Sequence, residues 1–308
     1  MVRPPDDLEA RGRASIKAGS KSFALASRVL PPNLRNDASM LYAWCRHCDD
    51  VVDGQEMGHG QVEGYREGQA DRLATLRQHT ADAFAGRDVP PEFVGMARVF
   101  ATHAIPHVYA DHHLNGFQMD VDQRVYESIE DVLDYSYHVA GVVGVMMAHV
   151  MGVRDPATLD RASDLGLAFQ LTNIARDVID DAVAGRVFVP EALLHRHGAP
   201  DDPMMLARPE NRPAAHAAAL DLLDVAESYY ASARIGIEAL PPRCAWAITA
   251  ALNVYREIGV VLRREGPEAW QGRVGAGGGR KLWLAVQSGR RGKPSPLSRD
   301  GLYTRPAA

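Results

Sequence analysis

Two polar stripes on apolar helical segments carry the clearest chemical signal in the sequence. The first lies within ASMLYAWCRHCDDVVD, which ends at Asp53, and the second within ASDLGLAFQLTNIARDVIDDAV, which ends at Val183. Residues spaced three and four apart share one face of a helix, so each segment has an apolar stripe with a polar stripe beside it. The first polar stripe comprises Tyr42, Arg46, Asp49 and Asp53. The second comprises Gln170, Asn173, Asp177 and Asp181.

Carboxylates one turn apart on such apolar helices need a countercharge. Asp49 and Asp53 are about 6 Å apart along a helix axis, and they repel each other more strongly where water is excluded. Hard oxygen ligands suit Mg²⁺, which bridges a few carboxylates to phosphate oxygens. Arg46 and Arg176 would add bidentate phosphate contacts. The pattern predicts a metal and diphosphate site, with a solvated or salt-bridged acidic face as the alternative.

The chain as a whole is predicted to be all-α. No stretch has the spaced runs of Val, Ile and Thr that strands require, whereas periods of three and four recur throughout. Prolines and glycines end the helical runs. The expected helices span residues 22–30, 37–53, 61–86, 91–104, 106–121, 127–152, 156–183, 212–238 and 243–265. Since no repeat of solenoid length is found, these helices favour a bundle.

Composition limits the class of protein and its compartment. The chain has 308 residues, 46% of them hydrophobic, and a net charge of −5, which is ordinary for a globular protein and indicates no nucleic-acid partner. Three cysteines cannot form a disulfide framework, and the N-terminus lacks the apolar core of a secretory signal, which favours the cytoplasm. The longest apolar run, Val139–Val153, is too short to span a membrane.

Residues 272–308 form a basic tail with eight Lys or Arg and one acid. The tail is rich in Gly, Pro and Ser, which favours partial disorder, whereas its charge suits an anionic membrane surface. A solvated tail and a peripheral contact at the inner face of the membrane both stay open. With a flexible N-terminus expected over residues 1–14, a single folded domain over residues 15–271 is predicted.

Other motifs are set aside. Cys45 and Cys48 form a lone CxxC on an apolar stripe, which favours core packing over zinc or redox chemistry. Glu56 and His59 form the one ExxH pair, too little for a di-iron bundle. Gly275–Gly277 follows no predicted strand, so neither a dinucleotide site nor bound NADPH is expected.

Five segments of the chain match motifs of one protein family, and together they are highly specific for it. They are Gly19–Phe23, LYAWCRHCDDVVDG from Leu41 to Gly54, YSYHVAGVVGVMMA from Tyr135 to Ala148, LGLAFQLTNIARDVIDD from Leu165 to Asp181, and GRVFVP from Gly185 to Pro190. In these segments the chain resembles the head-to-head prenyl synthases, that is, the squalene and phytoene synthases, and among them the bacterial phytoene synthases. The resemblance runs from about residue 15 to about residue 265.

The resemblance implies an isoprenoid-synthase bundle with a central apolar cavity. It implies a prenyltransferase that condenses two molecules of geranylgeranyl diphosphate to phytoene, through prephytoene diphosphate, in the first committed step of carotenoid biosynthesis. The metal would be Mg²⁺, with Mn²⁺ as a substitute. The alternatives are a squalene or dehydrosqualene synthase that uses farnesyl diphosphate, and a catalytically silent isoprenoid-diphosphate-binding protein.

The resemblance also implies roles for individual residues. Metal binding falls to Asp49, Asp53, Asn173, Asp177 and Asp181. Diphosphate contacts fall to Ser20, Ser22, Tyr42, Arg46, Gln170 and Arg176, with Tyr255 next to Arg256 as a further contact. Tyr135 matches an active-site tyrosine, with plain packing as an equal alternative. Gly116 and Asp120 match a family pattern to which no role is assigned.

Two further points concern single positions. Phe188 stands where relatives usually have Tyr, which puts any hydroxyl contact there in doubt. Small residues recur every three or four positions in the segment after Tyr135, at Ala140, Gly141, Gly144 and Ala148. They favour equally a groove for a polyprenyl chain and close packing against another helix.

Overall fold

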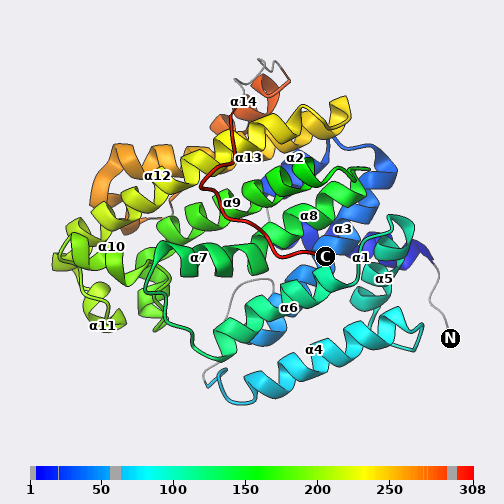
Figure 1. Cartoon of the computed structure of the whole chain (residues 1–308), viewed down its shortest axis with the longest axis horizontal. Coiled ribbons are helices and arrows are strands. Elements are labelled where there is room, and N and C mark those ends of the chain that lie inside the picture. The colour runs from blue at the N-terminus through cyan, green and yellow to red at the C-terminus, as the bar shows by residue number, and fades with distance from the viewer. Residues whose placement is uncertain (1–4, 20, 56–63, 273, 276, 290–296) are drawn as a thin grey trace.

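The computed structural model describes residues 5–19, 21–55, 64–272, 274–275, 277–289 and 297–308, with the backbone alone for residues 5–7 and 21–23. Within these ranges every regular element is a helix, so the all-α prediction is confirmed (Figure 1). The longer helices are α1 (Pro5–Gly19), α3 (Pro32–Asp53), α4 (Gln69–Phe84), α5 (Pro91–Thr102), α6 (Val108–Val121), α9 (Pro156–Val183), α12 (Arg212–Ile237), α13 (Pro242–Glu265) and α14 (Gly278–Gln287). The shorter ones are α2 (Lys21–Ser27), α7 (Ile129–Ser136), α8 (Val142–Val150), α10 (Glu191–Arg196) and α11 (Pro203–Leu206).

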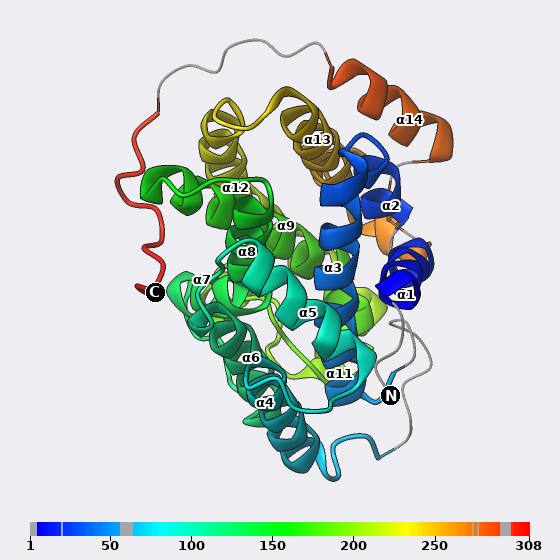
Figure 2. The same ribbon diagram turned by 90° about the vertical axis from the view of Figure 1, so that its right-hand side faces the viewer.

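Helix α9 is the centre of the bundle. It contacts α12, α13, α8 and α7 (Figures 1 and 2). Its bounds are those expected from the sequence, because Pro156 starts the helix and the side chain of Asp155 caps it by accepting a hydrogen bond from the backbone N–H of Thr158 at 2.9 Å. Helix α8 contacts both α9 and α3, the two helices that carry the acidic stripes.

The helix expected over residues 127–152 contains a π-helical segment. α7 and α8 are joined by the π-helix η1 (Tyr137–Gly141), and the N-terminus of α7 is closed by a capping box between Ser128 and Asp131. An inserted π turn rotates the residues on its two sides relative to each other, and such turns are frequent at functional sites. The π-helix begins directly after Ser136, which follows Tyr135 in the sequence.

The start of the chain differs from the expectation of a flexible N-terminus over residues 1–14. The structure has helix α1 from Pro5, and Ile16 on it is only 3% exposed. At Gly12 the helix lies so close to α3 that an added Cβ would be 2.9 Å from the backbone of Ser39. The helix is therefore packed against the bundle.

The helix expected over residues 61–86 begins later, at Gln69. Gly64 and Gly68 both have positive φ, of +72° and +71°. This left-handed conformation cannot continue an α-helix, so residues 64–68 form turns that lead into α4.

The last residues of the chain are held against the bundle and are not a solvated tail. Arg299 donates from Nε and Nη2 to the two carboxylate oxygens of Asp164, both at 2.8 Å. Arg305 pairs with Asp160 at 2.7 Å, and the Tyr303 hydroxyl donates to Asp134 at 3.0 Å. Residues 297–308, which we call the C-terminal strap, thus run across α9 and α7 (Figure 2). The expectation of a solvated tail is wrong for this part because acidic residues on α9 and α7 neutralise its charge.

One described helix has the length and hydropathy of a membrane span. It covers Pro242–Gln271, with a mean hydropathy of 1.2 over its most apolar window, and 67% of that window is buried against the rest of the protein. Burial to this extent is what the core helix of a bundle requires.

We expect the strap to stabilise the fold through Asp164. The side chain of Asp164 is 1% exposed, so Arg299→Ala would leave a buried carboxylate with Ser232 as its remaining hydrogen-bond donor. Loss of one partner of a buried pair costs about 3 kcal/mol, so the melting temperature should fall by about 5 °C. Circular dichroism on heating measures this.

Arg208→Ala is the matched control, because Arg208 lies 4.0 Å from Glu210 in a pair exposed at both ends. Its melting temperature should be unchanged. Adding Asp164→Asn to Arg299→Ala should restore part of the loss by removing the buried charge. An unchanged melting temperature for Arg299→Ala would contradict the stabilising role of the strap.

Candidate active site

The first acidic stripe occupies the end of α3. Asp49 and Asp53 lie one turn apart, and the helix stops directly after Asp53 because Gly54 is left-handed, with φ +60°. The guanidinium of Arg46 pairs with Asp49. Asp53 accepts a hydrogen bond from Nη2 of Arg186, 3.3 Å away, in the loop after α9. Both carboxylates of this stripe are therefore bound by an arginine.

The second stripe occupies the last turns of α9. Nε of Arg176 donates to Oδ1 of Asp177 at 2.6 Å, and Nη2 bonds the other carboxylate oxygen. One turn earlier, Nδ2 of Asn173 lies 3.5 Å from Oε1 of Gln170. Oδ1 of Asn173 is buried and has no hydrogen-bond partner among the described residues. A buried oxygen that accepts no hydrogen bond is well suited to bind a cation.

Arg186 brings the two stripes into one site. Besides its bond to Asp53, its charge acts on the carboxyl groups of Asp49, Asp120 and Asp181, which come from α3, α6 and α9. Burial lowers the pKa of Arg186, but these acidic neighbours, Asp53 foremost, outweigh that effect and raise it. The guanidinium is thus the protein's own countercharge at the centre of the acidic cluster.

The sequence pattern does not single out Arg186 or give Asp120 a role. Arg186 stands in the sequence only as part of the segment GRVFVP, and its position shortly after the second stripe is the available signal. For Asp120 the signal was a family pattern alone. That both face the stripes depends on how α6 and the loop after α9 fold back, which spacing along the chain does not determine.

Burial raises the pKa of three carboxyl groups in this cluster. It raises the pKa of Asp49 to about 6, with Asp53 adding to the rise and Arg46 opposing it. It raises the pKa of Asp120 to about 7, and that of Asp181 to about 8, where the charge of Asp177 adds to the effect. Carboxyl groups perturbed in this way are typical of functional sites, because an added cation would stabilise their charged form.

Tyr135 faces the same cluster from the end of α7. Its hydroxyl donates to Oδ2 of Asp120 at 3.4 Å, and its ring is stacked on Phe188 with the centroids 5.3 Å apart. The ring of Tyr126 lies 5.2 Å from that of Tyr135. Burial raises the pKa of Tyr135 well above its ordinary value, so the hydroxyl keeps its proton. Phe188 thus packs the face of its ring against Tyr135.

The predicted diphosphate-contacting residues that are described lie around α3, α9 and α13. Tyr42 precedes Arg46 by one turn, with the guanidinium 6.0 Å from the ring centroid. Tyr255 on α13 stacks on Phe169 with centroids 4.2 Å apart. Its hydroxyl lies within electrostatic range of Arg176, Tyr42 and Arg46, and burial raises its pKa. The three helices therefore present these groups to one region.

The remaining predicted contacts are only partly placed. Ser20 lies outside the described residues, and Ser22 lies in α2 without a described side chain. At the end of α1 an added Cβ on Gly19 would collide with the Tyr42 hydroxyl. The segment that precedes Ser20 is therefore in direct contact with the first stripe. Arg256 is turned toward Glu227, with Nε 2.8 Å from the carboxylate.

The donor set fits Mg²⁺ without enclosing it. Carboxylates and the Asn173 amide oxygen are hard ligands, which Mg²⁺ prefers. Over the described part of the chain, no three His, Cys, Asp or Glu side chains come close enough together to hold an ion by themselves. An ion here would take its other ligands from water or from a diphosphate, as Mg²⁺ commonly does.

The lone CxxC packs in the core, as expected. Cys45 and Cys48 are free thiols, and Cys48 is fully buried. Burial raises the pKa of Cys45 to about 12 and that of Cys48 well above its ordinary value. Thiols that stay protonated bind zinc poorly.

The small residues after Tyr135 serve close packing, not a groove, at the two glycines that the structure tests. An added Cβ on Gly144 would collide with the carbonyl oxygen of Ala162, and one on Gly141 would lie 2.9 Å from Oγ of Ser163. From the other side, a Cβ on Gly166 would collide with the carbonyl oxygen of Ala140. This contact fixes the helix that follows Tyr135 against the helix that carries the second stripe.

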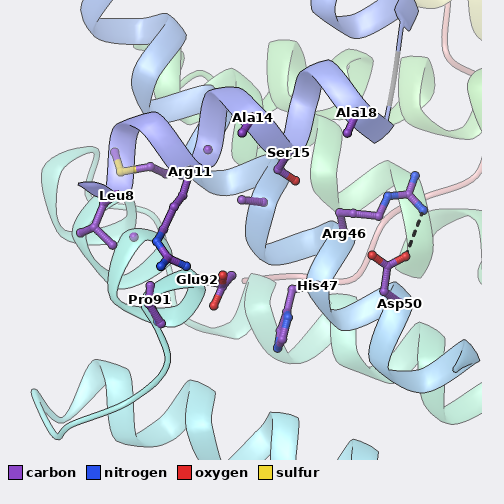
Figure 3. A pocket seen from close by; sticks show the side chains of 14 residues that line it. Leu8, Arg11, Ala14, Ser15, Ala18, Arg46, His47, Asp50, Pro91 and Glu92 are labelled. Atoms are coloured by element: carbon purple, nitrogen blue, oxygen red, sulfur yellow. Dashed lines mark ion pairs between the residues drawn. The ribbon is translucent and has the colours of Figure 1, made fainter. Parts of the chain in front are cut away.

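Two pockets adjoin the site. One of about 220 Å³ has Asp120, Tyr126 and Arg186 in its wall, so it opens onto the acidic cluster. The other, of about 370 Å³, lies between α1, α3 and α5. Figure 3 shows Arg46 at its edge, turned toward Asp50, with a nitrogen to oxygen distance of 4.0 Å. Arg46 therefore borders both the cluster and this pocket.

Comparison with known proteins finds relatives that match nearly the whole chain. Residues 16–280 match the family model described as squalene/phytoene synthase. The chain is 49% identical to the 15-cis-phytoene synthase of a Paracoccus species, over 97% of this chain and 98% of that one. It is 48% identical to the phytoene synthase of Pseudescherichia vulneris, over 93% and 92% of the two chains.

Among solved structures, the fold is similar to that of a dehydrosqualene synthase crystallised with a ligand. The TM-score is 0.79 and the identity 26%, with 92% of this chain and 95% of that one covered. A squalene synthase from Alicyclobacillus acidocaldarius shares the fold with a TM-score of 0.70. The family match and the relatives that are nearly half identical show that this chain belongs to the squalene/phytoene synthase family.

Proposed function

We propose that the protein is a phytoene synthase that condenses two molecules of geranylgeranyl diphosphate head to head, through prephytoene diphosphate, to phytoene. This is the first committed step of carotenoid biosynthesis. The observation that carries the proposal is the convergence of both aspartate stripes on one partly buried cluster around Arg186, in a chain 49% identical to a 15-cis-phytoene synthase. The cluster is suited to a reaction in which a diphosphate leaves.

The acidic residues are assigned to metal binding. Asp49, Asp53, Asn173, Asp177 and Asp181 would hold Mg²⁺, or Mn²⁺ in its place. The bound ion supplies positive charge to the departing diphosphate. No NADPH is required in this reaction.

The cationic and hydroxyl groups are assigned to the diphosphate. Arg46 and Arg176 each hold an aspartate and can turn part of their fork to phosphate oxygens. Tyr42, Gln170 and Tyr255 would add hydrogen bonds, together with Ser20 and Ser22 from the segment after α1. Charge develops on the diphosphate as it leaves, which is where such fixed donors stabilise the transition state.

Tyr135 is assigned to the hydrocarbon side of the site. Its protonated hydroxyl is held by Asp120 and its ring by Phe188, so its ring and oxygen have fixed positions next to the acidic cluster. A fixed aromatic ring stabilises a nearby carbocation through its π face. Together with Tyr126 it also keeps water from that side, which a reactive cation requires.

The second candidate is a synthase that uses farnesyl diphosphate to make squalene or dehydrosqualene. The similarity of the fold to a dehydrosqualene synthase favours it. The two reactions share the acidic cluster and differ in the length of the apolar cavity, which we propose runs through the centre of the bundle. Squalene formation would in addition consume NADPH.

The proposed place of action is the cytoplasm, at the inner face of the membrane. The product is a forty-carbon hydrocarbon without a polar group, which is taken up by a bilayer and not by water. The basic residues of the C-terminal region provide attraction to an anionic surface.

The product of the purified protein tests this function. With Mg²⁺ and geranylgeranyl diphosphate, and without NADPH, we expect phytoene, identified by mass spectrometry of the extracted lipid. A thirty-carbon product from farnesyl diphosphate in preference would establish the second candidate. No product from either substrate would leave the silent diphosphate-binding protein.

Removing one carboxylate from either stripe should abolish turnover. Asp49→Asn and Asp177→Asn each remove a charged metal ligand, so we expect turnover to fall about 100-fold or more with unchanged helicity by circular dichroism. Asp180→Asn is the matched control, because Asp180 is on the same helix but exposed. Near-normal turnover in both stripe variants would overturn the metal assignment.

Stability of the metal-free protein should fall as the pH rises. The pKa values of Asp120 and Asp181 in the fold, about 7 and about 8, lie above those of an unfolded chain. The folded state therefore binds more protons than the unfolded chain between about pH 4 and about pH 8, and the free energy of unfolding declines with pH over that range. Between about pH 6 and about pH 8 we expect the melting temperature in a chelator to drop by several degrees.

Added Mg²⁺ should raise the melting temperature more at the higher pH, because fewer protons compete for the carboxylates. Asp181→Asn removes one titrating group, so its melting temperature should depend less on pH. An equal pH dependence in this variant and the wild type would show that Asp181 is not the source.

A further inference from the structure

Helix α14 carries an apolar face that nothing in the described structure covers. The face comprises Leu282, Trp283 and Val286, which are 57%, 51% and 62% exposed. Spacings of one, three and four residues place them on one side of the helix. Leu284 on the opposite side is 8% exposed and faces the bundle. In Figure 1, α14 lies at the top of the molecule, outside α13.

This exposure is imposed by fixed contacts and is not the result of a loose helix. Nε1 of Trp246 donates to the carbonyl oxygen of Ala285 at 2.8 Å. Nδ2 of Asn253 donates to Oγ of Ser288 at 2.9 Å. Nε and Nη2 of Arg280 donate to the carboxylate of the buried Glu257, at 2.8 and 3.0 Å. All three contacts join α14 to α13, so they hold the apolar face outward.

Trp246 extends the apolar face onto α13. It is 38% exposed, and its hydrogen bond to Ala285 places it directly beside α14. We call Trp246, Leu282, Trp283 and Val286 the α14 face. Large apolar side chains exposed together in this way, two of them Trp, mark an interaction surface more often than chance exposure does.

Basic residues lie on α14 and in the sequence that flanks it. The guanidinium of Arg280 lies 4.5 Å from the ring centroid of Trp283, in cation–π contact. Lys281 is the next residue, and the flanking sequence adds Arg273, Arg290, Arg291 and Lys293. A helix with Trp and Leu on one face and basic residues beside it is typical of helices that lie in the headgroup region of an anionic bilayer.

The other basic residues of the C-terminal region are not available for such a contact. Arg299 and Arg305 are paired with Asp164 and Asp160 in the C-terminal strap. Arg299 and Arg305 are thus tied to the core through α9, whereas the described basic residues Arg280 and Lys281 lie on α14 itself.

We propose that the α14 face is the surface by which this protein docks on an anionic lipid bilayer, with Leu282, Trp283 and Val286 inserted among the headgroups. The inference rests on the proposed function, because a forty-carbon hydrocarbon needs a bilayer to receive it. Its geometry suits that purpose. α14 packs on α13 and α2, and α13 carries Tyr255 toward the acidic cluster, so docking through α14 places one helix layer between the bilayer and the site.

Vesicle flotation with the full-length protein tests the proposal. We expect the protein to float with vesicles of phosphatidylcholine and phosphatidylglycerol, and much less with pure phosphatidylcholine or at high salt. The double variant Leu282→Glu, Trp283→Glu should reduce the floated fraction about tenfold. The control is Met204→Glu, Met205→Glu, which puts the same charges on an adjacent exposed pair in α11 and should float like the wild type.

Trp283→Ala, which adds no charge, keeps the test valid if the double variant does not fold by circular dichroism; it should also reduce flotation. Equal flotation of wild type and α14 variants would overturn the proposal. So would a concentration-dependent dimer, seen by light scattering, that the α14 variants abolish, because the face would then bind a second copy.

Synthase activity on detergent-dispersed substrate separates this inference from the proposed function. The α14 variants should retain it, because none of the altered residues lies at the acidic cluster. A protein that floats through α14 but makes no phytoene would contradict only the proposed function. A protein that makes phytoene but does not float would contradict only the proposal that α14 is the docking surface.

Discussion

The organisation of this protein depends on negative charge placed where water is scarce. Carboxylates from α3, α6 and α9 are brought together next to apolar helix faces, and burial raises the pKa of Asp49, Asp120 and Asp181. Such a cluster is tolerable only because cationic groups lie among the acids. Arg46, Arg176 and Arg186 each pair with an aspartate of the stripes. In the proposed function, a cation and a diphosphate would replace part of this pairing.

The scaffold keeps these groups in place through close contacts of small residues. Gly144 on α8 and Gly166 on α9 let the backbones of η1 and α8 approach that of α9 to a distance that no side chain would permit. The helix that continues from Tyr135 is thereby fixed against the helix that carries Asp177 and Asp181. Tyr135 meets Asp120 from the end of α7, directly before the π-helix that leads into α8. Burial is the main cause that raises the pKa of the tyrosine, and the neighbouring charge of Asp120 adds to it, so the hydroxyl keeps its proton.

Charge has opposite consequences in two parts of the basic C-terminal region. In the strap, Arg299 and Arg305 face acidic residues of α9, and the pairs tie the end of the chain to the core. Around α14, one arginine binds Glu257 and holds the helix in place, while the apolar side chains face outward. By composition alone, both parts are positively charged. Their difference comes from which side chains of the bundle lie underneath.

The sequence by itself determined the helical class, the two acidic stripes and most helix bounds, because periodicity, proline and caps act locally. It also carried the family resemblance, because each motif that shows the resemblance is one continuous stretch of sequence. Tertiary structure alone decided that Arg186 and Asp120 belong to the site, that Gly141 and Gly144 serve packing, and that α1 and the strap are bound to the bundle. These features depend on contacts between residues far apart in the chain, such as Arg186 with Asp53 and Arg299 with Asp164. Local spacing holds no information about such pairs, since they form only when the helices have packed.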